Sequence, residues 1–195
     1  MNETQPSATT TAPPRRFGLL KKILLLLAVA IMTLVVVILL QPNEYRVQRN
    51  AVMNAPPATV FAQVDDFHNW DKWSPWAKLD PNMKVTYEGP ASGAGAKYSW
   101  VGNDEVGEGR MTILESKPNE LIRIKLEFIK PFASTADTEF TFKPDGSQTA
   151  VQWSMAGKHN FVSKAMCLVM NMDKMVGPDF EKGLASLKGV VEAPK

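Results

Sequence analysis

Side chains that bind metals or form cross-links are scarce in this sequence. It contains one cysteine, Cys167, and two histidines, His68 and His159, in 195 residues. A single cysteine excludes an intramolecular disulfide, so the fold must be held together by its core. Neither histidine is accompanied by carboxylates or cysteines at metal-ligand spacing. We therefore expect no metal site and no other cofactor.

Motifs of nucleotide binding and of nucleophilic catalysis are also missing. The segment 89–97, GPASGAGAK, has no Gly-Lys-Ser/Thr ending and precedes an expected strand rather than a helix. Ser74, Ser99 and Ser154 lie in no Gly-x-Ser-x-Gly context. Cys167 lies among apolar residues of an expected helix, which indicates a buried, inert thiol. The sequence thus identifies no catalytic residue.

Neither charge is in excess over most of the chain. Lysine and arginine number 22, and aspartate and glutamate number 20. Four of the basic residues and one acidic residue lie before residue 23, which leaves 18 basic and 19 acidic residues in the rest. The sequence pI of about 8.6 therefore reflects the N-terminal segment rather than a basic binding face. We expect no nucleic-acid partner.

The N-terminal part contains a long run without charge, ILLLLAVAIMTLVVVILL, over residues 23–40. At about 1.5 Å per residue the run spans roughly 27 Å, enough for the core of a bilayer. A cleavable signal peptide is the alternative, but its apolar region is usually shorter, about 7–15 residues, and no small-x-small cleavage site follows here. We expect an uncleaved transmembrane helix over residues 17–41, preceded by a disordered cytoplasmic tail over residues 1–16.

Basic residues set the expected orientation of this helix. Four of them precede or open the apolar run: Arg15, Arg16, Lys21 and Lys22. By the positive-inside rule the N-terminus is cytoplasmic, and the chain after residue 41 lies on the periplasmic side of a bacterial inner membrane. Arg46 and Arg49 follow the run and leave the reverse orientation open.

After the apolar run the pattern changes to short elements. Residues 45–53 are extended in character, residues 58–66 read as a short helix, and a second short helix ends near Trp73, because Ser74 precedes Pro75. Six further strands follow, separated by turns rich in glycine, proline and aspartate: 83–89, 96–102, 106–115, 120–129, 135–143 and 148–157. This spacing predicts an antiparallel meander.

Strict alternation in these strands predicts one apolar face. Ile122, Ile124, Leu126 and Phe128 share one side of their strand, and charged residues share the other. The C-terminal segment should cover the apolar face, with a helix over residues 160–176 interrupted at Gly177-Pro178. A sharp apolar stripe follows: Phe180, Leu184, Leu187 and Val191. Pro178 either starts this second helix or kinks one longer helix.

In this order of elements the chain resembles the START/Bet v 1-like superfamily, specifically its polyketide-cyclase-like SRPBCC branch. The matching residues are Ala55-Pro56 before Val60-Phe61, Asp66, Trp70, Trp73-Ser74-Pro75-Trp76, Gly107-Glu108-Gly109 before Met111 and Ile113, and GPDFEKGLASLK at 177–188. The resemblance covers residues 45–192. It implies an α+β helix-grip fold: a curved antiparallel sheet of about seven strands, two short helices after the first strand, and a long C-terminal helix.

The resemblance also implies a function, because members of this superfamily bind lipids, sterols, quinones and polyketides, and a minority catalyse reactions. We expect a membrane-anchored binding module for an apolar small molecule or lipid, held between the sheet and the C-terminal helix. The residues expected to line that space are Trp73, Tyr87, Tyr98, Trp100, Met111, Ile113, Phe128, Phe140, Trp153, Met155, Met166 and Met170. The sequence names no protein partner.

Two other classes of function stay open. An enzyme of cyclase, aldolase or hydrolase type would need a titratable group in the cavity, and strand alternation supplies none. An interaction module would have a closed core and an exposed apolar patch. The cluster Trp70, Trp73 and Trp76 is typical of a hydrophobic lock that pins the short helices to the sheet, rather than of direct ligand contact.

Overall fold

The computed structural model of the protein describes residues 16–159, 161–168 and 171–194, with side chains from residue 18 on. The chain divides into two compact units, one ending at Gln41 and the other beginning at Pro42. The expected cytoplasmic tail, residues 1–16, lies outside the described residues apart from the first helical residue, Arg16.

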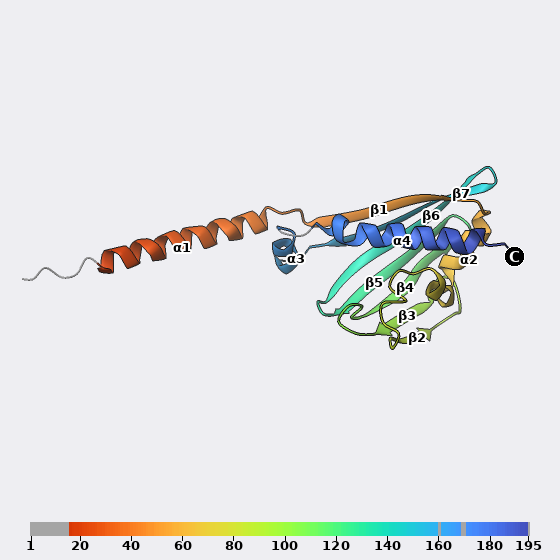
Figure 1. Ribbon diagram of the computed structural model, residues 1–195, viewed down its shortest axis with the longest axis horizontal. Coiled ribbons are helices and arrows are strands. Elements are labelled where there is room, and N and C mark those ends of the chain that lie inside the picture. Colours follow the sequence, from red (N-terminus) through yellow and green to blue (C-terminus); the bar gives the residue numbers. More distant parts are fainter. Residues whose placement is uncertain (1–15, 160, 169–170, 195) are drawn as a thin grey trace, which may run out of the picture. The chain divides into compact units, whose positions relative to one another are not determined.

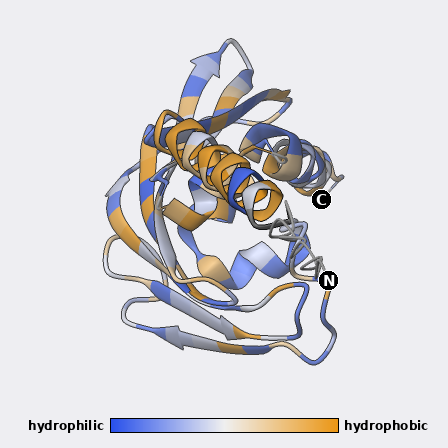
Figure 2. Ribbon diagram, turned by 90° about the vertical axis from the view of Figure 1, so that its left-hand side faces the viewer, coloured by the Kyte–Doolittle hydropathy of each residue, from blue (hydrophilic) through white to orange (hydrophobic). Residues whose placement is uncertain are grey.

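The first unit is dominated by a single helix, α1 (Arg16–Leu39). Its 22 residues Gly18–Leu39 are long and apolar enough to cross a membrane, and in Figure 2 the helix is orange around most of its surface. Its one hydroxyl group, on Thr33, donates to the carbonyl of Val29 at 2.9 Å, so the helix satisfies this polar group internally. The expected long apolar helix is confirmed.

In the second unit the described residues form a seven-stranded antiparallel sheet (Figure 1). The strands are β1 (Glu44–Met53), β2 (Lys84–Glu88), β3 (Lys97–Val101), β4 (Glu108–Lys117), β5 (Leu121–Lys130), β6 (Ser134–Asp145) and β7 (Gln148–Lys158). Their order is β1-β7-β6-β5-β4-β3-β2, so six strands form a meander and β1 pairs with the last of them. The predicted strands and meander are confirmed.

The sheet has an apolar inner face and a polar, solvent-exposed outer face. Along β5, Ile122 and Ile124 are fully buried. Arg123, between them, is exposed on the outer face and pairs with Glu115 at 2.7 Å and Glu139 at 3.0 Å on the neighbouring strands. Orange and blue segments alternate along the strands in Figure 2. This two-residue period confirms the predicted apolar face.

Two short helices, α2 (Pro57–Asp65) and the 3-10 helix η1 (Phe67–Lys72), cover the inner face at the end where β1 finishes. Pro57 is tolerated because the first residue of a helix has no intrahelical partner for an N–H group. The indole groups of Trp70 and Trp73 are buried and donate to the carbonyls of Val64 and Gln63 at 2.9 and 3.0 Å. These two tryptophans thus pin the segment after α2 onto α2 itself.

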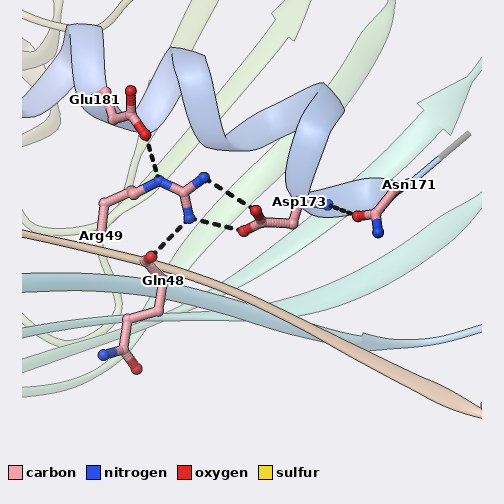
Figure 3. A network of polar contacts seen from close by, with 5 residues as sticks. All are labelled: Gln48, Arg49, Asn171, Asp173 and Glu181. Carbon is pink, nitrogen blue, oxygen red and sulfur yellow. Dashed lines mark hydrogen bonds and ion pairs between the residues drawn. The ribbon is translucent and has the colours of Figure 1, made fainter.

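The long C-terminal helix α4 (Met172–Glu192) lies along β1 (Figure 1). Of its predicted stripe it buries Phe180, Leu184 and Leu187, and Val191 is partly buried. Arg49 of β1 clamps the helix (Figure 3): its guanidinium group donates to Asp173 at 2.7 and 3.1 Å and to Glu181 at 2.6 Å. A Cβ atom on Gly177 would lie 1.9 Å from Nη2 of Arg49. Gly177, which has no side chain, therefore leaves room for the guanidinium group of Arg49 beside the helix.

The start of α4 differs from the expected helix over residues 160–176. Among its described residues that segment contains the short helix α3 (Phe161–Met166) and the beginning of α4, which starts at Met172 and runs through both Gly177 and Pro178. The boundary is set by Asn171, whose side chain accepts the backbone N–H of Asp173 at 2.8 Å as an N-cap. The Asp173 carboxylate in the first turn favours the same boundary. Pro178 lies inside α4, so the expectation that it starts a second helix is wrong.

We predict that Phe180→Ala lowers the free energy of unfolding by about 3–5 kcal/mol, because it removes a buried ring that stacks on Trp153. The matched control is Phe132→Ala, which truncates a ring that is 62% exposed and should change the free energy by no more than about 0.5 kcal/mol. Denaturant melts of residues 42–195 measure both. Equal effects of the two changes would contradict the assignment of Phe180 to the core.

Candidate functional site

Three of the expected lining residues form a packed aromatic stack. Trp153 of β7 stacks on Phe180 of α4 with 3.9 Å between ring centroids, and on Phe140 of β6 with 4.9 Å. Trp73 meets Trp153 edge-on at 5.8 Å. These rings fill the space between the sheet and α4 at this level. Here Trp73, Phe140 and Trp153 are core side chains.

A second group lies on the inner face nearer to the beginning of β1. Here Met155 pairs with Thr138, and Leu126 pairs with both Ala136 and Met111. Leu126, Phe128 and Tyr98 are only partly buried in this region, whereas Met111, Ala136, Thr138 and Met155 are buried. We refer to the following six residues as the proximal strip: Met111, Leu126, Phe128, Ala136, Thr138 and Met155.

Small residues let two aromatic rings approach the sheet beside the proximal strip. The ring of Tyr45 lies over Gly157, where a Cβ atom would be 2.6 Å from Oη. The ring of Trp100 lies over Gly109, where a Cβ atom would be 2.4 Å from the indole. The indole N–H of Trp100 donates to the carbonyl of Val106 at 2.9 Å. Trp100, one of the expected lining residues, is thus oriented by a backbone group that does not belong to the strip.

Two fully buried polar atoms on this face have no hydrogen-bond partner among the described residues: Oγ1 of Thr138 and Nε1 of Trp153. Thr138 pairs with Met155, and Phe140, two residues further along β6, pairs with Trp153. Thr138 and Trp153 are therefore diagonal neighbours, which places their Cβ atoms about 7 Å apart. An unpaired buried polar group costs about 1–3 kcal/mol. The apolar face thus carries two unsatisfied polar groups close together.

The remaining expected residues lie elsewhere. Ile113 is fully buried in the core. Tyr87 belongs to the edge strand β2, is 40% exposed and stacks on His68 with 4.0 Å between centroids. Met166 is exposed on α3, and Met170 lies outside the described residues.

Two surface hollows stand out among the described residues, and neither lies over the proximal strip. One, of about 290 Å³, is on the outer face of β1, β7 and β6 beside Asn50 and Gln152. The other, of about 240 Å³, lies between η1 and the β2–β3 turn and is lined by His68 and Tyr87. Both are smaller than typical small-molecule sites, which span about 300–1,000 Å³.

Comparison with known families assigns the second unit. Residues 44–192, about three quarters of the chain, match the family described as polyketide cyclase/dehydrase and lipid transport. The chain belongs to this polyketide cyclase/dehydrase and lipid transport family. The expected SRPBCC, Bet v 1-like domain is thereby confirmed. No curated protein matches the chain.

Solved structures support the fold of this family member. The chain is similar to protein CV1439 from Chromobacterium violaceum, with 19% identity, a TM-score of 0.55, and coverage of 78% of this chain and 99% of the other. It is similar to the Aha1 dimer from Colwellia psychrerythraea at 15% identity and a TM-score of 0.56, covering 77% and 98%. It is also similar to Ara h 8.0201, with 11% identity, a TM-score of 0.52, and coverage of 76% of this chain and 97% of the other. Identities this low show the helix-grip fold alone.

The family description includes both enzymes and lipid transport. An enzyme would need titratable groups near the inner face. One pair of a thiol and a base lies at the start of this region: Sγ of Cys167 is 3.6 Å from Nε2 of His159. Partial burial and the charge of Lys164 lower the pKa of His159. Cys167 is only partly buried, contrary to expectation, because it follows the end of α3 instead of lying inside a long helix. No group of three His, Cys, Asp or Glu residues suited to a metal occurs in the described part of the chain.

The tyrosines beside the inner face hold their protons tightly. Burial raises the pKa of Tyr98 to about 12, with smaller contributions from Tyr87 and from the charge of Asp71. Burial also raises the pKa of Tyr45 and, together with Asp71 and Asp66, that of Tyr87. At neutral pH these phenols are uncharged hydrogen-bonding groups at the edges of an apolar surface.

We predict that the native chain shows less tyrosinate absorbance at pH 10 than the urea-unfolded chain, which titrates near pH 10, and that Tyr98 ionises near pH 12 in the native chain. Because the folded state holds the proton more tightly, this stabilisation is complete below pH 10 and is lost as the pH rises towards 12. Tyr98→Phe should remove the highest step of the native titration curve. An unchanged native curve in that variant would contradict the assignment.

Proposed function

We propose that this member of the family is a membrane-anchored domain that binds an apolar small molecule or lipid on the proximal strip. The observation that carries the proposal is the pair of buried, unpartnered polar atoms on an otherwise apolar face, Thr138 Oγ1 and Trp153 Nε1. A ligand with an apolar body and one oxygen acceptor would satisfy both atoms. The body would contact Leu126, Phe128 and Met155.

The chemistry of these two groups narrows the class of ligand. The indole N–H of Trp153 can only donate a hydrogen bond, and the hydroxyl of Thr138 can donate or accept. A carboxylate, ester or ketone oxygen fits this pair, and a plain hydrocarbon leaves it unsatisfied. Fatty acids, acyl esters and polyketides all carry such an oxygen on an apolar body.

One segment without regular structure packs on the aromatic stack at the border of the strip. Residues 74–83 contain neither helix nor strand, and Trp76 from this segment meets Trp153 and Phe180 edge-on at 5.9 and 6.3 Å. The carboxylate of Asp80 holds the segment by accepting the backbone N–H groups of Asn82 and Asn103 at 2.9 and 2.8 Å. We place the entrance for the ligand at this segment.

Filling the strip tests the proposal. Ala136→Phe should weaken binding of a pyrene-labelled decanoic acid at least tenfold and change the free energy of unfolding by less than about 1 kcal/mol, because the new ring takes the place of the ligand. The control is Ala150→Phe, which makes the same change on the outer face and should leave binding intact. Binding is followed by fluorescence titration of residues 42–195, after circular dichroism has established that this segment is folded.

Removing one hydroxyl tests the polar pair. Thr138→Val should leave the unfolding free energy unchanged or raise it by up to about 1 kcal/mol, because the hydroxyl has no partner in the free protein. It should weaken binding of the pyrene-labelled acid about 3–10-fold and leave binding of pyrene-labelled decane unchanged. Thr141→Val on the outer face is the control. Equal losses for the acid and the hydrocarbon would contradict a role for the hydroxyl in recognition.

The anchor forms the second part of the proposal. We assign residues 17–41 to one uncleaved transmembrane helix and residues 45–192 to the binding domain, with residues 1–16 in the cytoplasm. The length and apolar surface of α1 support this assignment. The four basic residues at its N-terminal side favour an inner membrane with the domain on the periplasmic side.

A reporter enzyme that is active only outside the cytoplasm, fused after Lys195, should be active and should stay in the membrane fraction. Replacing Arg15 and Arg16 by glutamate should reduce that activity, since the charge bias that sets the orientation is weakened. Activity in the soluble periplasmic fraction would instead indicate a cleaved signal peptide, and an inactive fusion in the membrane would indicate the reverse orientation.

One observation favours a second candidate, an interaction module with a closed core. The stack of Phe140, Trp153 and Phe180 fills the space between sheet and helix, as such a module requires. Under this alternative the wild type binds no apolar probe, and Ala136→Phe overpacks the core and costs about 1–3 kcal/mol or more. The same titration and melts therefore separate the two functions.

A further inference from the structure

Large apolar side chains gather on one end of the second unit. Phe132, in the β5–β6 turn, is 62% exposed, and Phe161 and Val162 of α3 are 52% and 54% exposed. Together with four more exposed residues they form what we call the end surface: Ile129, Phe132, Phe161, Val162, Met166, Leu168 and Met175. A concentration of exposed apolar side chains on one part of a domain marks a site of contact with a partner or a membrane.

The end surface lies where β1 begins. Glu44, the first residue of β1, pairs with Lys158, the last residue of β7, so α3 follows directly at this end of the sheet. Asn43 ties α3 to the start of β1: its carbonyl accepts the N–H of His159 at 2.8 Å, and its side chain accepts Nζ of Lys164 at 2.5 Å. The β5–β6 turn is at the same end because β6 runs antiparallel to β7.

The length of the connection to the apolar helix identifies the partner. α1 ends at Leu39 and β1 starts at Glu44, so the residues between them can span at most about 18 Å when fully extended. A transmembrane α1 therefore keeps the beginning of β1 close to the bilayer surface. Exposed lysines, Lys158 and Lys174, flank the apolar side chains and suit anionic headgroups.

We propose that the end surface inserts into the lipid headgroup region of the membrane that α1 spans. This inference rests on the proposed anchor and extends it: the domain is not tethered freely but lies on the bilayer through its own side chains. Phe132 and Phe161 enter the interface as apolar groups on a polar rim, as in other interfacial contacts. The entrance proposed at residues 74–83 then lies on a domain whose orientation to the lipid is fixed.

The test uses the full chain in nanodiscs of phosphatidylcholine and phosphatidylglycerol. Cys167→Ala removes the only cysteine, and Ser134→Cys or Ser147→Cys adds one exposed labelling site next to the end surface or on the opposite β6–β7 turn. A fluorophore at each site reports quenching by nitroxide-labelled lipid. We expect at least threefold stronger quenching at position 134 than at position 147.

Proximity alone would also favour position 134, so the deciding comparison is between surface variants. Phe132→Ser with Phe161→Ser should reduce quenching at position 134 at least threefold. Leu114→Ser, a change of similar size at an exposed site outside the end surface, should leave it unchanged. Near-ultraviolet circular dichroism of each variant establishes that the fold is retained.

Three results would overturn the proposal. Quenching that is the same with and without Phe132 and Phe161 means that the domain does not touch the lipid through the end surface. A doubled protein mass per nanodisc that returns to a single copy in the double variant means that a second copy of the chain covers this surface. A chain that does not enter nanodiscs at all removes the anchor as well, which distinguishes failure of the proposed anchor from failure of the docking alone.

Discussion

The stacking of Trp153 on Phe180 is the contact on which the rest of the second unit depends. It joins the last strand to the C-terminal helix with 3.9 Å between ring centroids and an interplanar angle of 9°. Gly183 permits this approach, since a Cβ atom there would lie 2.8 Å from the Trp153 ring. With the helix fixed at this distance, Arg49 can reach both Asp173 and Glu181.

The same stack divides the inner face of the sheet in two. Towards the end of β1 the rings of Trp73 and Phe140 and the residues of α2 and η1 close the core completely. Towards the beginning of β1 the cover is looser, and Leu126 and Phe128 are only partly buried. The two unpartnered polar atoms lie where these regions meet. This division separates a dry core from a less completely covered apolar surface, on which we propose that the ligand binds.

The fold was predictable from the sequence because its determinants are local and periodic. Alternation along residues 122–128 specifies the inner face of β5, and the spacing of Phe180, Leu184 and Leu187 specifies the buried side of α4. The start of α4 was not predictable from hydrophobicity, because the capping of Asp173 by Asn171 decides it rather than the apolar residues on either side. The expectation that Cys167 is buried was wrong because α3 ends at Met166 and Cys167 does not lie inside a long helix.

The candidate site was only partly predictable. Alternation places Met111, Phe128 and Met155 on the inner face, but it does not say that Trp153 is sealed beneath a helix whereas Leu126 is not. Tyr87 shares the inner parity and yet lies on an edge strand, because strand order across the sheet is a tertiary property. Thr138 was missed by attention to apolar residues alone. A threonine between Ala136 and Phe140 on the apolar parity of β6 was the available signal.

Methyl NMR of methionine tests the central claim, that the apolar body of the ligand lies on the proximal strip and not in the core at the other end of the sheet. In residues 42–195 carrying labelled methionine methyl groups, a saturated fatty acid should shift the signals of Met111 and Met155 and broaden or shift no signal of Met53, which is fully buried at the other end. Unchanged signals of Met111 and Met155 at saturating fatty acid, or equal shifts at all three methionines, would contradict the account.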